Sequence, residues 1–162
     1  MSAIISPCGQ YRYRLDRPGD LTATRGPAVF IMLNPSTADA TTDDRTIGRC
    51  RAFAQAWGCN GLVVANLYAY RATKPADLWL AADPIGPDND EHLIQVAAGA
   101  GEIVCAWGAE ARPDRVAAVA RMLTDAGAKL RCLGITKLAG APRHPLYVRG
   151  DQPLIPWEPK WT

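Results

Sequence analysis

The sequence lacks a long apolar run, and its formal net charge is only +2, because 18 Lys and Arg are set against 16 Asp and Glu. No segment approaches the roughly 18 apolar residues that a membrane span needs. Residues 1–15 also lack the basic and apolar regions of a signal peptide. We therefore expect a cytoplasmic protein without a membrane partner. The small charge permits a nucleic-acid partner but does not demand one.

Cysteine pairs of the C-x-x-C type, which mark zinc and redox sites, are also missing. The five cysteines are spread along the chain, and Cys105 and Cys132 lie in apolar runs, where cysteine usually acts as a small hydrophobe. We expect reduced thiols, no metal site and no cofactor. A cluster held by several cysteines is the less favoured alternative. Histidine is scarce, since only His92 and His144 occur, and His92 is expected to be a solvated surface residue.

The chain does contain enough apolar residues, 48% of 162, to form a single domain over residues 1–162. Four short and nearly continuous apolar runs are typical of strands that are buried on both faces of a parallel sheet. These runs cover residues 28–33, 61–67, 102–107 and 129–134. Amphipathic helical patterns lie between them, at residues 45–57, 89–98 and 113–126.

Ahead of the first run, segments 10–15 and 21–24 flank Arg17-Pro18-Gly19-Asp20, which has the composition of a turn and predicts an N-terminal hairpin. Strands that alternate with helices imply right-handed crossovers. The sequence therefore predicts an α/β fold, a three-layer α/β/α sandwich around a mostly parallel four-stranded sheet. The tail, residues 151–162, is expected to pack on the domain through Trp157 and Trp161.

Polar or special residues follow each of the four predicted strands. In open parallel sheets, ligands bind at the carboxyl ends of the strands, where the loops converge. The segments in question are Asn34-Pro35-Ser36, Asn66, Trp107-Gly108 and His144. We expect them to surround one pocket.

Each of these segments also has a purely structural explanation. Asn34-Pro35 can initiate a turn, and Ser36 can cap a helix. Asn66 interrupts an apolar strand, so its amide is either tied to neighbouring backbone or kept for a ligand, and the strand itself does not decide between the two. His144 can be a loop residue that is hydrogen-bonded for structure.

The order of these segments resembles the motifs of the uracil-DNA glycosylase superfamily. That superfamily has a strand followed by Gly-x-[Asp/Asn]-Pro, a strand that ends in asparagine, a strand that ends in Trp-Gly, and a final motif that begins His-Pro. The matching segments here are Leu33-Asn34-Pro35, Val63-Val64-Ala65-Asn66, Trp107-Gly108 and His144-Pro145. More closely, the strings MLNPSTAD, NLYAYRAT and PRHPLY are similar to a bacterial and phage family of domains of unknown function, which supplies no activity.

The resemblance to the glycosylases implies three roles. Asn34 would position the attacking water, Asn66 would read the Watson–Crick edge of an extruded base, and His144 would stabilise the departing base anion. Further substrate contacts are expected from Pro35, Ser36, Tyr68, Trp107, Gly108, Arg143 and Tyr147.

Several assignments stay open within this resemblance. Tyr70 and Phe53 are alternatives to Tyr68 as the aromatic that stacks on the base, and Leu146 or Tyr147 could be a wedge. A carboxylate could come from Asp39, Asp43 or Asp44, although capping of the helix that follows explains these residues more simply. Met32 stands where the superfamily has glycine.

The function expected from this resemblance is a glycosylase-like hydrolase that acts on a modified or damaged base in nucleic acid or in a nucleotide. The alternative is a non-catalytic module that binds a base or nucleotide in the same pocket. In a third possibility, a protein-interaction domain, Asn34, Asn66 and His144 would lie far apart. The oligomeric state does not follow from the sequence.

Overall fold

Four parallel strands occupy the middle of the sheet, and each comes from one of the apolar runs. The structure is a computed structural model that describes residues 1–36 and 38–159. Parallel pairing joins β4 to β3, β3 to β5 and β5 to β6. Almost all residues of these strands are buried, which explains why their sequences do not alternate between apolar and polar residues. The strands are β3 (Ala28–Met32), β4 (Leu62–Asn66), β5 (Glu102–Cys105) and β6 (Leu130–Cys132).

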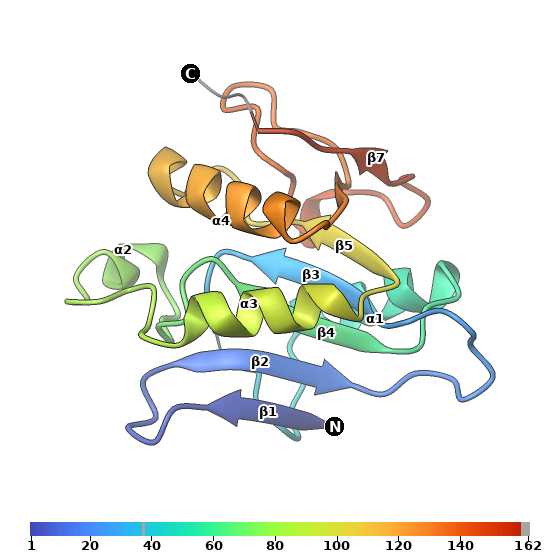
Figure 1. The fold of residues 1–162 in the computed structure, drawn as a ribbon, viewed down its shortest axis with the longest axis horizontal. Helices are drawn as coiled ribbons and strands as arrows, with labels where there is room; N and C mark the ends of the chain where they lie inside the picture. The colour runs from blue at the N-terminus through green and yellow to red at the C-terminus, as the bar shows by residue number, and fades with distance from the viewer. Residues whose placement is uncertain (37, 160–162) are drawn as a thin grey trace.

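Three antiparallel strands extend this sheet at its edges: β1 (Ser2–Ile5) and β2 (Arg12–Arg17) on one side, and β7 (Ile155–Pro156) on the other. β2 pairs with β1 and β4, and β7 pairs with β6. The described residues thus form one mixed, seven-stranded sheet in the order β1-β2-β4-β3-β5-β6-β7 (Figure 1). The predicted four-stranded sheet is incomplete, because β2 and β7 pair with strands that would otherwise leave open edges.

The N-terminal hairpin exists, but its predicted position is wrong. Its two strands are β1 and β2, joined by a turn in which Gly9 has a φ of +75°. Residues 21–24 form no strand. At Gly19 the chain instead passes very close to the backbone just before β4. A Cβ added at Gly19 would lie 2.1 Å from the backbone nitrogen of Gly61. Pro18-Gly19 therefore marks a close backbone crossing, a role that glycine serves as readily as a turn.

Helices cover both faces of the sheet. The predicted helices are confirmed as α1 (Arg45–Ala56), α3 (Asn89–Ala98) and α4 (Pro113–Asp125), and the structure adds α2 (Pro75–Leu78) and a 3-10 turn, η1 (Pro145–Tyr147). The buried side chains of α1 pack with alternate residues of β3, such as Phe30. Those of α3 and α4 pack with the intervening residues, such as Ile31, on the other face. Figure 1 shows α3 crossing in front of the sheet.

The C-terminal tail returns to the sheet, as the sequence predicts. Trp157 is buried, donates its backbone N–H to the carbonyl of Leu130, and meets Trp107 edge-on with ring centroids 5.1 Å apart. Trp161 lies outside the described residues. All five cysteines are free thiols. No helix among the described residues is both long enough and apolar enough to cross a membrane.

Candidate functional site

A cavity of about 660 Å³ opens at the carboxyl ends of the parallel strands. Its walls include residues that follow β3, β4, β5 and β6, so the topology of the sheet creates it. Asn34, Asn66 and His144, which are distant along the chain, all line this cavity. The third alternative, in which these side chains lie far apart, is therefore not supported.

Asn66 is the last residue of β4, and its side chain lacks hydrogen-bond partners. The residue is only 1% exposed, and neither Nδ2 nor Oδ1 has a partner among the described residues. A buried polar group without a partner costs about 1–3 kcal/mol. Of the two explanations given for this asparagine, the structure does not support a tie to neighbouring backbone.

The backbone of β4 at this point is held firmly, unlike the side chain of Asn66. Asn89, the first residue of α3, donates from Nδ2 to the carbonyls of Asn66 at 2.9 Å and Leu67 at 3.1 Å. Arg115 of α4 donates from Nε to the Leu67 carbonyl at 2.9 Å. The end of the strand is thus fixed in place, and the Asn66 amide is presented at a defined position in the cavity wall.

Asn34 has one tethered end and one free end. Its Nδ2 donates to the carbonyl oxygens of Pro35 at 3.0 Å and Ala72 at 2.7 Å. Because carbonyl oxygens only accept, these two contacts determine which end of the amide carries the NH₂ group. Oδ1 has no hydrogen bond to any residue in the described ranges, so it is the atom that Asn34 can offer to a ligand or water.

His144 is held as a neutral imidazole. The backbone N–H of Leu146 donates to its Nδ1 at 3.2 Å, which requires Nδ1 to be unprotonated. Burial lowers the pKa of His144, while the nearby Asp44 carboxylate acts in the opposite direction. The neutral ring then carries its proton on Nε2, which makes Nε2 a hydrogen-bond donor.

Five of the other predicted residues also line the cavity: Ser36, Trp107, Gly108, Arg143 and Tyr147. Gly108 has a φ of +76°, a conformation that favours glycine, and this turn directs the chain away from β5. Arg143 donates to the carbonyl of Tyr147 at 2.8 Å. Tyr147 is 73% exposed, and its ring centroid lies 5.6 Å from that of His144. It therefore stands at the edge of the cavity.

Two predicted contact residues do not line this cavity. Pro35 is buried beside it, and its carbonyl accepts from Asn34 and from the backbone N–H of Ala72. Tyr68 lies in the core with α3 and α4, and its hydroxyl accepts from the backbone N–H of Arg112 at 3.3 Å. β4 ends at Asn66 and the chain bends at residues 67–68, so Tyr68 does not continue the side-chain alternation of the strand. Its expected stacking on a base does not fit this position.

Arg12 is a cavity residue that the sequence analysis missed. It is the first residue of β2, which runs antiparallel to β4 and therefore begins where β4 ends. The residue is 3% exposed, and its Nη1 donates to the carbonyl of Ala38 at 2.6 Å. The only signal in the sequence is an arginine within a predicted strand, and Arg14 carries that same signal without reaching the cavity.

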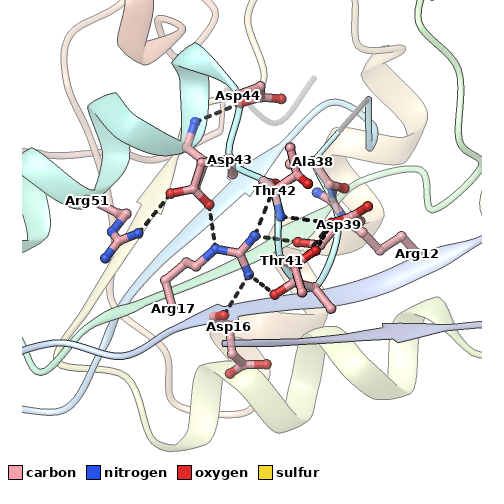
Figure 2. Close-up of polar contacts among 12 residues, drawn as sticks. Arg12, Asp16, Arg17, Ala38, Asp39, Thr41, Thr42, Asp43, Asp44 and Arg51 are labelled. Carbon is pink, nitrogen blue, oxygen red and sulfur yellow. Dashed lines mark hydrogen bonds and ion pairs between the residues drawn. The ribbon is translucent and has the colours of Figure 1, made fainter.

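The predicted carboxylates occupy the loop that leads from Asn34 to α1. Asp44 caps α1 by accepting from the backbone N–H of Ile47 at 2.9 Å, and it also lines the cavity. Asp43 pairs with Arg17 at 2.5 Å and with Arg51 at 2.8 Å (Figure 2). Asp39 accepts from the backbone N–H groups of residues 41 and 42. Of these three predicted carboxylates only Asp44 lines the cavity, where Glu110 is a second acidic residue, and Asp44 also caps α1.

A buried arginine organises this loop. Arg17 uses all of its donors: Nε binds Asp43, while Nη1 and Nη2 together reach four backbone carbonyls. Figure 2 shows the guanidinium of Arg17 at the centre of these contacts. The carbonyls belong to Asp16, Asp39, Ala40 and Thr42. Arg17 is the last residue of β2 and Arg12 is the first. Through Arg17, the loop that supplies Ser36 and Asp44 to the cavity is attached to the end of β2.

The fold and the site define a mixed α/β protein with a cavity, lined in part by polar side chains, at the carboxyl ends of its parallel strands. The chain belongs to the family described as "Protein of unknown function (DUF1643)", whose profile matches residues 12–146. The matched range includes Arg12, Asn34, Asn66 and His144. The match agrees with the similarity to a family of unknown function that the sequence strings indicated. Comparison with curated proteins and with solved structures gave no match.

Proposed function

We propose that the cavity binds a nucleobase and that the protein is a glycosylase-like hydrolase, which cleaves the N-glycosidic bond of a modified or damaged base in nucleic acid or in a nucleotide. The observation that carries this proposal is the Asn66 amide, which is buried at the cavity with both polar atoms unpartnered. An amide offers a donor and an acceptor side by side. The pairing edge of a nucleobase offers the complementary set, so a bound base would remove the cost of burying Asn66.

His144 supplies a donor for the leaving base. In glycosidic hydrolysis, the C1′–N bond breaks with its electron pair going to the base, which develops negative charge. The Nε2–H of a neutral His144 would donate a hydrogen bond to a carbonyl oxygen of that base. A donor already fixed in place stabilises charge that appears in the transition state. The hydrogen bond from Leu146 to Nδ1 supports this role, because it fixes the tautomer.

Asn34 orients the water. The oxygen of water bonds to C1′, and one of its protons ends on the departing base, so that the products are a free base and a sugar with a hydroxyl at C1′. The Oδ1 of Asn34 would accept a hydrogen bond from that water, since Nδ2 is tied to two carbonyls. An amide cannot take the proton at neutral pH, and the mechanism therefore relies on an oxocarbenium-like transition state.

This proposal includes the finer fold of the glycosylase superfamily, a three-layer α/β/α sandwich around four central strands, to which the chain's motifs are similar. The parallel pairing of β4-β3-β5-β6 and the helices on both faces support it. We place the activity in the cytoplasm, in line with five free thiols.

A second candidate is a non-catalytic module that binds a base or nucleotide in the same cavity. One observation favours it: Asp44, the only one of the predicted carboxylates that lines the cavity, already caps α1, and Asn34 cannot act as a base. Such a module would retain the roles of Asn66 and His144 as binding groups while lacking a group that activates water.

The two candidates are separated by looking for product. The protein is incubated with single- and double-stranded oligonucleotides that carry a panel of altered bases, and with nucleosides and nucleotides, and released base is detected by chromatography. We expect release to fall by about 100-fold in His144→Gln and in Asn66→Leu. His92→Gln is the matched control and retains activity, because His92 stacks on Tyr13 outside the cavity lining.

Two results would decide against the hydrolase. Base release that persists in a His144→Ala, Asn66→Ala double variant would show that these residues do not carry the reaction. Binding of bases or nucleotides without any product would favour the non-catalytic module.

A further inference from the structure

The cavity contains a buried cation that its walls do not satisfy. Arg12 has one hydrogen bond, from Nη1 to the carbonyl of Ala38, and its buried Nε has no partner. None of the ion pairs formed by the described residues includes Arg12. Buried arginines are normally paired with a carboxylate or another anion, because an unpaired buried charge is costly.

The guanidinium stays charged despite its position. Burial lowers the pKa of Arg12 to about 10, and the Asp44 and Asp39 carboxylates oppose this effect while Arg71 and Arg17 add to it. A group with that pKa is positively charged at neutral pH. Asp44 shares the cavity, but it is held at the N-terminus of α1 by the backbone N–H of Ile47, where the helix dipole favours it.

Arg12 and Asn66 define two different requirements for one ligand. β2 begins beside the end of β4, so both residues lie in the same wall of the sheet and line the same cavity. Asn66 requires a neutral edge with a donor and an acceptor. Arg12 requires an anion, and its planar fork fits the oxygen atoms of a phosphate. A ligand that meets both requirements carries a base and a phosphate.

We propose that the ligand is a free mononucleotide, with Arg12 holding its terminal phosphate inside the cavity and Asn66 holding its base. This inference rests on the proposed base-binding role of Asn66. Arg12 is 3% exposed, so the anion must enter the cavity to reach it. A phosphodiester within a polymer continues in both directions and stays at the surface, whereas a terminal phosphate has no chain beyond it.

Two further features agree with a small ligand. The cavity volume of about 660 Å³ lies within the range of small-molecule sites, roughly 300–1,000 Å³. The net charge of +2 gives no general attraction for a polyanion.

The test compares ligands that differ only in the phosphate. Dissociation constants are measured by calorimetry for the 5′-monophosphates of uridine, thymidine, adenosine and guanosine, for the matching nucleosides, for inorganic phosphate and for a single-stranded thymidine oligonucleotide. We expect at least one monophosphate to bind about tenfold or more tightly than its nucleoside, and more tightly per site than the oligonucleotide.

Variants then assign this preference to Arg12. In Arg12→Gln the advantage of the monophosphate should disappear while the affinity for the nucleoside is kept, and Arg12→Lys should keep part of the advantage. The matched control is Arg14→Gln, because Arg14 lies on the same strand but outside the cavity and pairs with Asp16. The ligand series on the unaltered protein needs no variant to fold.

The outcomes separate this inference from the proposed function. Equal affinity for nucleoside and monophosphate, or binding of the oligonucleotide alone, overturns the phosphate site and leaves the base site standing. Binding of inorganic phosphate without any base-containing ligand supports the Arg12 site and removes the proposed function. No binding to any of these ligands, nor to the nucleosides and monophosphates of the altered bases used in the activity test, overturns both.

Discussion

The two ends of β2 carry arginines that are almost equally buried and very differently satisfied. Arg17 is 2% exposed, and all of its donors are bound by Asp43 and four backbone carbonyls. Arg12 is 3% exposed and has one hydrogen bond. Figure 2 shows both side chains beside the loop that contains Ala38 and Asp39. Because buried polar groups are normally satisfied, Arg17 is complete within the protein and Arg12 requires a ligand.

The same contrast holds for two asparagines at the end of β4. Asn89 places its Nδ2 on two backbone carbonyls and supports the fold. Asn66 has neither side-chain atom bonded. Burial alone therefore does not distinguish the two asparagines; they differ in that Asn89 has one side-chain atom bonded and one unpartnered, whereas Asn66 has both unpartnered.

The largest effect is expected from Arg17→Gln. This variant leaves the loop carbonyls without their charged donor and Asp43 with Arg51 as its remaining partner, and loss of one partner from a buried charged network costs about 3–5 kcal/mol. Urea unfolding measures the change. Arg14→Gln is the control, since the partly exposed Arg14–Asp16 pair should contribute less than about 1 kcal/mol. Equal stability of the two variants would contradict the expectation that the Arg17 network contributes more to the free energy of unfolding than the Arg14–Asp16 pair does.

The next effect concerns the two asparagines. Asn89→Leu should lower the free energy of unfolding by about 1–3 kcal/mol, because it removes a buried donor from the carbonyl of Asn66. Asn66→Leu should leave stability unchanged or raise it by about 1 kcal/mol, because it removes an amide that no protein group satisfies. Both variants are compared by urea unfolding. A large loss of stability in Asn66→Leu would indicate that its amide has a structural role.

The third effect returns to Arg12. Arg12→Met removes an unpaired buried charge at the cost of one hydrogen bond, so the free energy of unfolding should change by less than about 1 kcal/mol or increase. Thermal unfolding measures this without added ligand. A loss as large as that of Arg17→Gln would show that the two arginines are equivalent, and the comparison on which the phosphate site rests would fail.

The elements of the fold were largely predictable because their signals are local. Continuous apolar runs gave four parallel strands, and periodic apolar residues gave α1, α3 and α4. The hairpin was misplaced because Pro18-Gly19 suits both a turn and a close backbone crossing. The short strand β7 depends on pairing with β6, which no local pattern encodes.

The site was predictable only where a residue follows a strand. Asn34, Asn66 and His144 fit the rule that parallel strands direct their following loops to one edge. Arg12 and Tyr68 show its limit. An arginine on an antiparallel neighbour reaches the cavity through the register of β2 against β4, and a tyrosine two residues beyond Asn66 turns into the core instead. The positions of Arg12 and Tyr68 depend on which strands pair and on where the chain turns after β4, and no local sequence pattern specifies either.

His144 is intermediate between the two arginines in how far its side chain is satisfied, because Nδ1 accepts from Leu146 while Nε2 has no hydrogen bond to the part of the chain that the structure describes. Among the variants considered, replacement of His144 should change the free energy of unfolding least. Since burial lowers its folded pKa below the unfolded value of about 6.5, the neutral ring contributes fully above about pH 6.5. That contribution is lost as the pH falls through the folded pKa. Unfolding of the parent at about pH 5 and about pH 8 should therefore show a drop in acid that His144→Gln reduces, and an NMR titration of the ring should locate the pKa. A folded pKa above 6.5 would mean that the cavity prefers imidazolium, and a neutral donor at this position would be excluded.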